Sequence, residues 1–379
     1  SNIKFKNFNI SKKKFKTKFT KEKWFKEIKL LKSLQLNYKY SYSKNLIKKL
    51  KKNDNFRVIG IGGSSLGIEA IYQFLKHKIK KRFIFINNLK PKLNNNEKKI
   101  KATNIIISKS GNTLETIANS NLLINQKKNI FITENKKSYL KNLATDLKAE
   151  IIDHKNYIGG RYSVLSEVGM LPAEIMGLNE KKFKRYNNLI SSQNFLNELT
   201  KNVSAILKFI SQKKFNSIIL NYDIKSENLF KWYQQLIAES LGKKSKGIFP
   251  IISTMPKDNH SLMQYFLDGP KNNFYTFFSV NQKKSNKLKN KNLLLNEKKL
   301  YGKNINEIIN AQKSATEKVF LRKKIPFRSF TINQRSEKSL GALFSFFILE
   351  TILLGRALNV NPFDQPAVEL IKTETKKLF

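Results

Sequence analysis

The chain has 379 residues, which is enough for about two to three domains with a sizeable buried core. Apolar residues make up 40% of it and include 28 Phe, so wholesale disorder is excluded. The absence of cysteine excludes disulfides, a thiol nucleophile and thiolate metal sites, and three histidines are too few and too scattered for a histidine-rich zinc site. We therefore expect no metal and no cofactor.

The charge balance is strongly basic, with 73 Lys and Arg against 27 Asp and Glu, a net charge of +46. Alone, this balance would favour nucleic acid or an anionic membrane as a partner. The excess is nearly all Lys and is spread over most segments together with Asn, Ile and Phe, which indicates a compositional bias rather than a binding stripe. We expect neither nucleic acid nor a membrane as the partner, whereas the diffuse positive potential favours capture of small anionic substrates.

The N-terminal 25 residues alternate Lys with Phe and Ile and lack the apolar core of a secretory signal. We predict a solvated basic arm here, and a transit peptide remains the alternative.

The first half of the chain alternates short apolar runs with helical periodicity. Strands are predicted at Arg57–Ile61, Arg82–Asn87, Asn104–Ser108 and Asn129–Thr133, and helices at Leu66–Leu75, Leu114–Asn125 and Ser138–Lys148. Such alternation is typical of a doubly wound parallel α/β sheet.

The pattern restarts after a predicted helical stretch over Lys181–Ser211. Strands at Ser217–Tyr222, Gly247–Ile252, Asn273–Val280 and Pro326–Ile332 alternate with helices, and the Lys- and Asn-rich segment Asn281–Lys299 is predicted as a loop. The longest apolar run, Gly341–Gly355, contains Glu350 and is too short to span a membrane, so it predicts a buried core helix. We expect a basic arm with helices over 1–50, two α/β domains over 51–185 and 186–355, and a C-terminal tail over 356–379.

A glycine-rich turn, Gly60–Gly67, joins a predicted strand to a helix. Its glycines permit a sharp turn, and the helix N-terminus offers free N–H groups to an anion. Ser65 stands where a dinucleotide fingerprint needs glycine, and no Gly-Lys-Ser/Thr of a phosphate-binding P-loop follows. By itself, the turn fits a simple strand–helix connection equally well.

A second strand–helix connection, Ser108–Thr113, brings Ser108, Ser110 and Thr113 together with Lys109. Hydroxyls donate hydrogen bonds and the lysine adds a point charge, so the loop predicts a phosphate cradle. The alternative is an N-cap beside a solvated Lys. Because both turns follow strands of one predicted parallel sheet, a shared anion site at its carboxyl edge is the more economical interpretation.

Four further sites carry candidate chemistry. Arg161 follows a glycine pair before a predicted helix and could stabilise an oxyanion, or simply form a structural salt bridge. Gln235 and Glu239 are four apart on one helix face that also carries Trp232, which could tune Glu239 as a general base, although a lone helical Glu is usually inert. His260 starts another predicted helix, where most histidines cap or pack. Asp364-Gln365 and Lys372 flank a short element that could close over a cleft.

The order and spacing of these motifs resemble the glucose-6-phosphate isomerase family. The matching blocks are Ile59–Gly67, Ser108–Thr116, Gly159–Gly169, Trp232–Lys243, Asp258–Gln264 with Asp268–Pro270, and Phe363–Lys372. They cover most of the chain from about residue 57 to 372, and the Gly-Gly-Arg-Tyr-Ser and Glu-Ser-x-Gly-Lys blocks are highly specific.

The resemblance implies two sugar-isomerase (SIS) domains, a cytoplasmic homodimer with a shared active site, and metal-free interconversion of glucose 6-phosphate and fructose 6-phosphate. It assigns substrate binding to eight residues: Gly63, Ser64, Ser108, Lys109, Ser110, Thr113, Gln235 and Gln365. It makes Glu239 the base that moves a proton between C2 and C1, and Arg161 the group that stabilises the enediolate. His260, from the partner subunit, and Lys372 would assist ring opening.

The chain departs from the family pattern at Ser65, where Asp is usual, at Pro256-Lys257, and at Pro366 and Ile371. These departures leave room for a broader aldose–ketose isomerase that accepts mannose 6-phosphate. Among enzymes, the alternatives are a bifunctional phosphoglucose/phosphomannose isomerase and an amino-sugar phosphate isomerase built on the same pair of SIS domains. A sugar-phosphate sensor that binds nucleic acid is the alternative outside enzymes. A sensor would need neither the base nor the ring-opening pair, and the sequence offers no helix-turn-helix segment.

Overall fold

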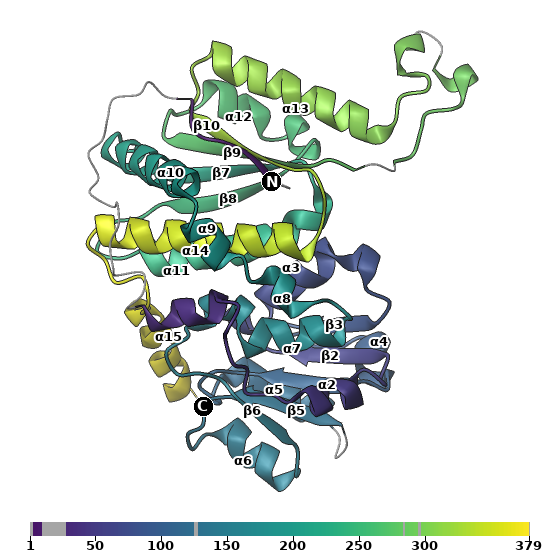
Figure 1. Ribbon diagram of the computed structural model, residues 1–379, viewed down its shortest axis with the longest axis vertical. Coiled ribbons are helices and arrows are strands. Elements are labelled where there is room, and N and C mark those ends of the chain that lie inside the picture. The colour runs from purple at the N-terminus through teal and green to yellow at the C-terminus, as the bar shows by residue number, and fades with distance from the viewer. Residues whose placement is uncertain (1–2, 10–27, 125–127, 283–284, 295–296, 379) are drawn as a thin grey trace.

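The computed structural model describes residues 3–9, 28–124, 128–282, 285–294 and 297–378. Two five-stranded sheets lie one above the other, and helices α11 and α14 lie between them (Figure 1). The largest hydrophobic cluster fills this middle layer, with Trp232, Leu236, Phe344 and Phe347 among its buried members.

The first sheet has the strand order β3-β2-β4-β5-β6, and every neighbouring pair is parallel. Its strands are β2 (Asn55–Ile59), β3 (Arg82–Ile86), β4 (Thr103–Ile107), β5 (Asn129–Thr133) and β6 (Glu150–Asp153). The doubly wound α/β prediction is confirmed, as are its first four strands. The edge strand β6 was not predicted, because only one of its four residues, Ile152, is fully buried and the apolar signal is correspondingly short.

One helix precedes the first sheet in the chain, four connect its strands and one follows it. They are α2 (Lys44–Leu50), α3 (Leu66–Phe74), α4 (Asn95–Lys99), α5 (Leu114–Leu123), α6 (Tyr139–Asp146) and α7 (Glu167–Ile175).

The second sheet has the order β1-β10-β9-β7-β8. Its parallel strands are β7 (Asn216–Asn221), β8 (Phe249–Thr254), β9 (Asn273–Val280) and β10 (Phe327–Ile332), as predicted, and β1 (Ile3–Lys6) pairs antiparallel with β10.

The strand β1 corrects the prediction of a solvated N-terminal arm for residues 3–8. The alternation of Ile3 and Phe5 with lysines is the period-2 pattern of a half-buried strand, and the Phe5 ring lies 4.7 Å from that of Phe330. Phe8 is buried as well. Residues 10–27, on which the rest of that prediction and the transit-peptide alternative fall, lie outside the described residues.

The helices of the second half are α8 (Glu180–Phe183), α9 (Tyr186–Ile190), α10 (Gln193–Ser211), α11 (Glu227–Leu241), α12 (Met263–Asp268), α13 (Ile305–Arg322), α14 (Glu337–Ala357) and α15 (Pro366–Lys377). The first three lie where a single helical stretch was predicted over Lys181–Ser211. The Ser192 side chain caps α10 by accepting from the backbone N–H of Phe195, so the periodic stretch is interrupted by a new helix start.

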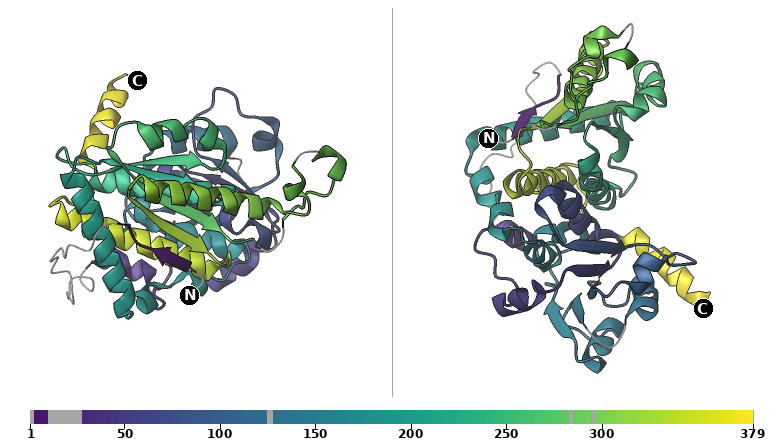
Figure 2. Two further views of the ribbon diagram at one scale, coloured as in Figure 1. Left: turned by 90° about the horizontal axis from the view of Figure 1, so that it is seen from above. Right: turned by 90° about the vertical axis from the view of Figure 1, so that its right-hand side faces the viewer.

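Helix α14 contains the predicted apolar run. Among the described residues it is the one helix long and apolar enough to cross a membrane, and 83% of its apolar window is buried inside the protein. It packs against α8, α10 and α11, as expected of a core helix. Helix α15, in contrast, projects from the body and has no buried residue (Figure 2).

The segment predicted as a loop after β9 carries two short 3-10 turns, Lys291–Leu293 and Lys298–Leu300, and no longer helix or strand in its described part. It extends away from the second sheet before α13 (Figure 1).

Candidate active site

The site lies at the carboxyl edge of the first sheet, between β2 and β4. These strands are neighbours, yet β3 lies beyond β2 and β5 lies beyond β4, so the connections that leave them diverge. Such a switch point opens a crevice at the carboxyl ends of the strands. The two turns that the sequence singled out, 60–65 and 108–113, follow β2 and β4 at this edge.

The loop 108–113 forms a compact cluster of hydroxyls before α5. Ser108 Oγ lies 2.8 Å from Thr113 Oγ1 and accepts from the backbone N–H of Gly111 at 3.2 Å. Gly111 adopts φ +68°, which favours glycine, and Ser110 Oγ accepts from the N–H of Asn112. Ser110 is exposed and Thr113 is half-buried, so the cluster has a face open to a ligand. We call this cluster, which the sequence predicts to bind a phosphate, the hydroxyl cradle.

Lys109 contacts the segment that follows β6. Its ammonium donates to the backbone carbonyl of Asn156 at 2.7 Å and lies 3.5 Å from the carboxylate of Glu134. Burial lowers the pKa of Lys109 below its ordinary value, and Glu134 opposes that shift. Lys109 therefore joins the cradle to the segment after β6 as well as adding positive charge. Glu134 was not predicted, because it lies after a different strand, far along the chain.

The turn after β2 approaches two other segments closely. A Cβ atom on Gly63 would lie 2.2 Å from the carbonyl carbon of Gly160, and one on Gly62 would lie 2.8 Å from Gln235 Nε2. Glycine is required at both positions, at Gly62 also because φ is +57°. Ser64 is half-buried in the same turn. The turn thus lies against three segments: β4, which leads into the loop 108–113, the segment of Arg161, and α11.

Glu239 lies on α11 beside Gln235 and Arg161. Gln235 Nε2 donates to Glu239 Oε1 at 2.9 Å, and Arg161 Nη1 donates to Glu239 Oε2 at 3.1 Å. The side chain of Glu239 keeps 30% of its surface exposed, so a substrate can reach the carboxylate. Gln235 Oε1 is buried without a hydrogen-bond partner in the described part of the chain, which leaves an acceptor for a substrate hydroxyl.

Arg161 is only 2% exposed and uses all five of its N–H groups. Nε donates to Ser240 Oγ at 2.8 Å, and Nη2 donates to the backbone carbonyls of Pro362 and Asp364. Nη1 donates to Gln365 Oε1 at 2.7 Å as well as to Glu239. An incoming oxyanion can therefore bind only by displacing an acceptor, and the exposed Gln365 on Nη1 is the one most readily released.

Two positioning residues, Tyr162 and Ser240, were not predicted. The hydroxyl of Tyr162 lies 2.9 Å from Ser240 Oγ and donates to the carbonyl of Pro362 at 2.9 Å, and both residues are fully buried. Lys243 adds an ion pair to Asp364 at 2.7 Å. All three lie inside the specific Gly-Gly-Arg-Tyr-Ser and Glu-Ser-x-Gly-Lys blocks, and that membership was the signal that could have identified them.

His260 and Lys372 are not brought into this site by their own chain. His260 is exposed in the 3-10 turn Lys257–His260, and Lys372 is exposed on α15, where it pairs with Glu369 at 2.6 Å. In the described part of the chain, neither residue makes a hydrogen bond or ion pair with Glu239 or Arg161.

The fold defines a class: α/β proteins in which two largely parallel sheets are joined through a layer of helices. Two solved structures share the fold: a hypothetical protein from Thermus thermophilus (TM-score 0.79, 22% identity, covering 92% of this chain and 90% of that one) and a glucose-6-phosphate isomerase from Chlamydia trachomatis (TM-score 0.71, 19% identity, 92% and 72%).

Within that class, the chain belongs to the phosphoglucose isomerase family. The sequence profile of the family, described as phosphoglucose isomerase, matches residues 46–379. The chain is 31% identical to a probable glucose-6-phosphate isomerase of Methanococcus maripaludis, over 91% of this chain and 85% of the relative. It is 33% identical to the glucose-6-phosphate isomerase of Mycoplasmopsis pulmonis, over 89% and 87%.

Proposed function

We propose that the protein interconverts glucose 6-phosphate and fructose 6-phosphate in the cytoplasm, as a step of glycolysis and gluconeogenesis. The observation that carries this is the placement of Glu239: a solvent-accessible carboxylate held between an amide and a guanidinium. It lies beside the turn that borders the hydroxyl cradle. A carboxylate with a fixed cation next to it suits proton transfer on carbon, because the cation stabilises the oxyanion that forms.

The proposed roles follow from the contacts. The cradle of Ser108, Ser110 and Thr113, with Ser64 and Lys109, would bind the phosphate through hydroxyl and ammonium donors. Glu239 would take the proton from C2, leaving an enediolate, and return it to C1, while the oxyanion displaces Gln365 from Arg161 Nη1. Gln235 would accept a hydrogen bond from a sugar hydroxyl through its free Oε1.

Ring opening would depend on His260 and Lys372. Because the chain leaves both outside its own site, we propose a homodimer in which the partner subunit supplies its His260. The tail that carries Lys372 begins at the segment 362–365, which Arg161 holds, so that segment is the anchor from which α15 could reach the substrate.

The test is a coupled assay in EDTA with glucose 6-phosphate and mannose 6-phosphate side by side. We expect the wild-type enzyme to isomerise glucose 6-phosphate and to exchange its C2 hydrogen with solvent deuterium. Glu239→Gln keeps the shape but cannot accept a proton, so kcat should fall at least about 10²-fold with little change in KM. If that variant keeps more than half of the activity, Glu239 is not the base. Equal rates with mannose 6-phosphate would instead support the bifunctional alternative.

A further inference from the structure

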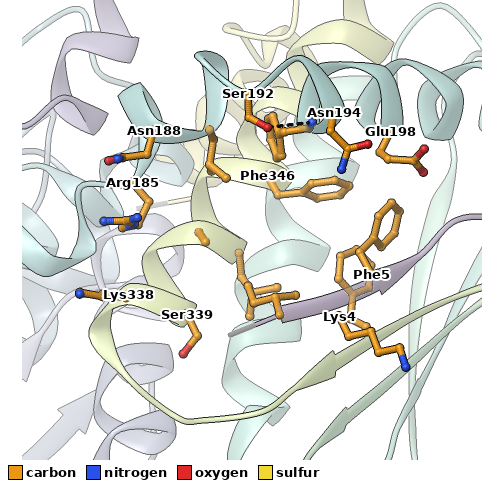
Figure 3. Close-up of a pocket in the computed structure, with 16 residues that line it drawn as sticks. Lys4, Phe5, Arg185, Asn188, Ser192, Asn194, Glu198, Lys338, Ser339 and Phe346 are labelled. Carbon is orange, nitrogen blue, oxygen red and sulfur yellow. Dashed lines mark hydrogen bonds between the residues drawn. The ribbon is translucent and has the colours of Figure 1, made fainter. Parts of the chain in front are cut away.

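A cavity of about 680 Å³ lies between β1, α9, α10 and the first turns of α14 (Figure 3). None of the residues assigned to substrate binding or catalysis above lines it. Its volume falls in the range of pockets that hold small organic ligands, roughly 300–1,000 Å³, and is much larger than an inorganic ion requires.

Aromatic rings form one wall of this cavity. Phe5 lies 4.7 Å from Phe330 and 5.3 Å from Phe346, and Phe195 meets Phe346 edge-on at 6.1 Å. Phe330 and Phe346 are buried, whereas Phe5 and Phe195 are half-exposed toward the opening. A flat ring entering the cavity would find edges and faces to pack against.

The polar part of the lining is positively charged. Arg185 and Lys338 lie on one side of the cavity, and Lys4 lies on β1 at the opposite side (Figure 3). In the part of the chain that the structure describes, none of these three cations makes an ion pair. The single carboxylate of the lining, Glu198, is already occupied by Lys201 at 2.7 Å and by the Asn7 amide at 3.2 Å.

We propose that this cavity is a second binding site, for an aromatic anion: a flat ring that carries a phosphate or carboxylate group. The ring would pack on the phenylalanine wall, and the anionic group would bind Arg185 and Lys338. Arg185 offers a planar set of donors that matches either anion in two-point contact. The cations and the apolar wall together select this class of ligand, because a bare phosphate would use the cations but not the wall.

The test uses isothermal titration of the full chain with 1-naphthyl phosphate, with inorganic phosphate and 1-naphthol as half-ligands. Equilibrated glucose 6-phosphate and fructose 6-phosphate are present at saturation, so that the candidate active site is occupied. We expect one 1-naphthyl phosphate per chain, bound at least about tenfold more tightly than either half-ligand, because each half-ligand uses one part of the cavity only.

The variants locate the site. Arg185→Gln with Lys338→Gln should weaken 1-naphthyl phosphate about ten- to a hundredfold. Ala342→Phe, which fills the half-buried lining position on α14, should abolish binding. The control Lys318→Gln removes the same charge from the exposed face of α13 and should leave the affinity unchanged. All variants should keep wild-type isomerase activity, which shows that they are folded.

Three results would overturn the proposal. The first is the absence of binding. The second is an affinity for inorganic phosphate equal to that for 1-naphthyl phosphate. The third is a loss of affinity in Lys318→Gln as large as that in the double variant. Either result would show that the general basic charge of the protein captures the anion. If the wild-type chain has no isomerase activity, the proposed function is contradicted, whereas the test of 1-naphthyl phosphate binding still holds.

Discussion

At the residue scale, the ammonium of Lys109 donates to the carbonyl of Asn156 and lies 3.5 Å from Glu134, and in the proposed function it also adds its charge to the phosphate cradle. Lys109→Ala should raise KM for glucose 6-phosphate about ten- to a hundredfold, since a hydrogen bond to a charged group is worth roughly 1.5–3 kcal/mol. Steady-state kinetics of the variant and the wild-type enzyme measure this change in KM. Lys136→Ala is the matched control, because Lys136 pairs with the same Glu134 at 2.5 Å but is more exposed. An unchanged KM in Lys109→Ala would place Lys109 outside the site.

His154, next to this loop, provides a pH-dependent contribution to stability. Burial lowers its pKa from 6.5 to about 4, so the folded protein keeps it neutral where the unfolded chain binds a proton. Its contribution is complete above about pH 6.5 and is lost as the pH falls toward 4. Between pH 7 and 5 the wild-type protein should lose about 2 kcal/mol more unfolding free energy than His154→Gln. Urea titrations at the two pH values measure the difference, and parallel losses in both proteins would contradict the assignment.

At the scale of elements, the site depends on how α11 is fixed to the segments on either side. Arg161 donates to Ser240 on α11 and to the carbonyls of Pro362 and Asp364 after α14, so one guanidinium sets the position of the base relative to the C-terminal tail. Trp232, on the same helix, donates to the backbone carbonyl of Arg161 at 3.1 Å and packs edge-on against Phe344 of α14. These hydrogen bonds therefore link α11, Arg161 and the start of the C-terminal tail.

Ser240→Ala removes the acceptor of Arg161 Nε and leaves the other four donors in place. We expect kcat to fall about tenfold with KM changed less than twofold, because the guanidinium loses orientation while the phosphate cradle is intact. Ser345→Ala deletes a hydroxyl that is equally buried on α14 but has no partner among the described residues, and should leave kcat unchanged. A change in KM alone, or an equal fall of kcat in both variants, would show that Ser240 does not position Arg161.

At the scale of the whole molecule, the two sheets have separate tasks. The first supplies the cradle and Arg161, and the second-half helix α11 supplies Gln235 and Glu239, so the site exists only where the two halves meet. His260, exposed after β8 of the second sheet, is the residue through which the proposed homodimer would extend this dependence to a second copy of the chain.

Subunit mixing tests that dependence. Chains carrying Glu239→Gln and chains carrying His260→Ala, co-expressed with different tags, form heterodimers with one intact site if His260 acts across the interface. The doubly purified heterodimer should then have about half of wild-type activity, although each homodimer is impaired. If His260 acts within its own chain, both sites of the heterodimer are damaged and activity does not recover.

Local sequence determined much of this protein. The alternation of apolar runs with helical periodicity predicts both parallel sheets, because period and burial are properties of a single element. The turn glycines, the hydroxyls of 108–113 and the spacing of Gln235 and Glu239 were visible for the same reason, since each is a property of neighbouring residues. The strand β6 and the break between α9 and α10 were not visible, because a short edge strand and a new helix start leave only a weak periodic signal.

Only the tertiary structure decided how distant segments meet. It placed Arg161 against Glu239 and on the carbonyls after α14, gave β1 its partner in β10, and left His260 and Lys372 outside the site of their own chain. It also tied Lys109 to Asn156 and Glu134. The physical reason is that a side chain's type and spacing fix its face on an element, whereas its partners depend on which elements pack together. That packing is settled by burial over the whole molecule.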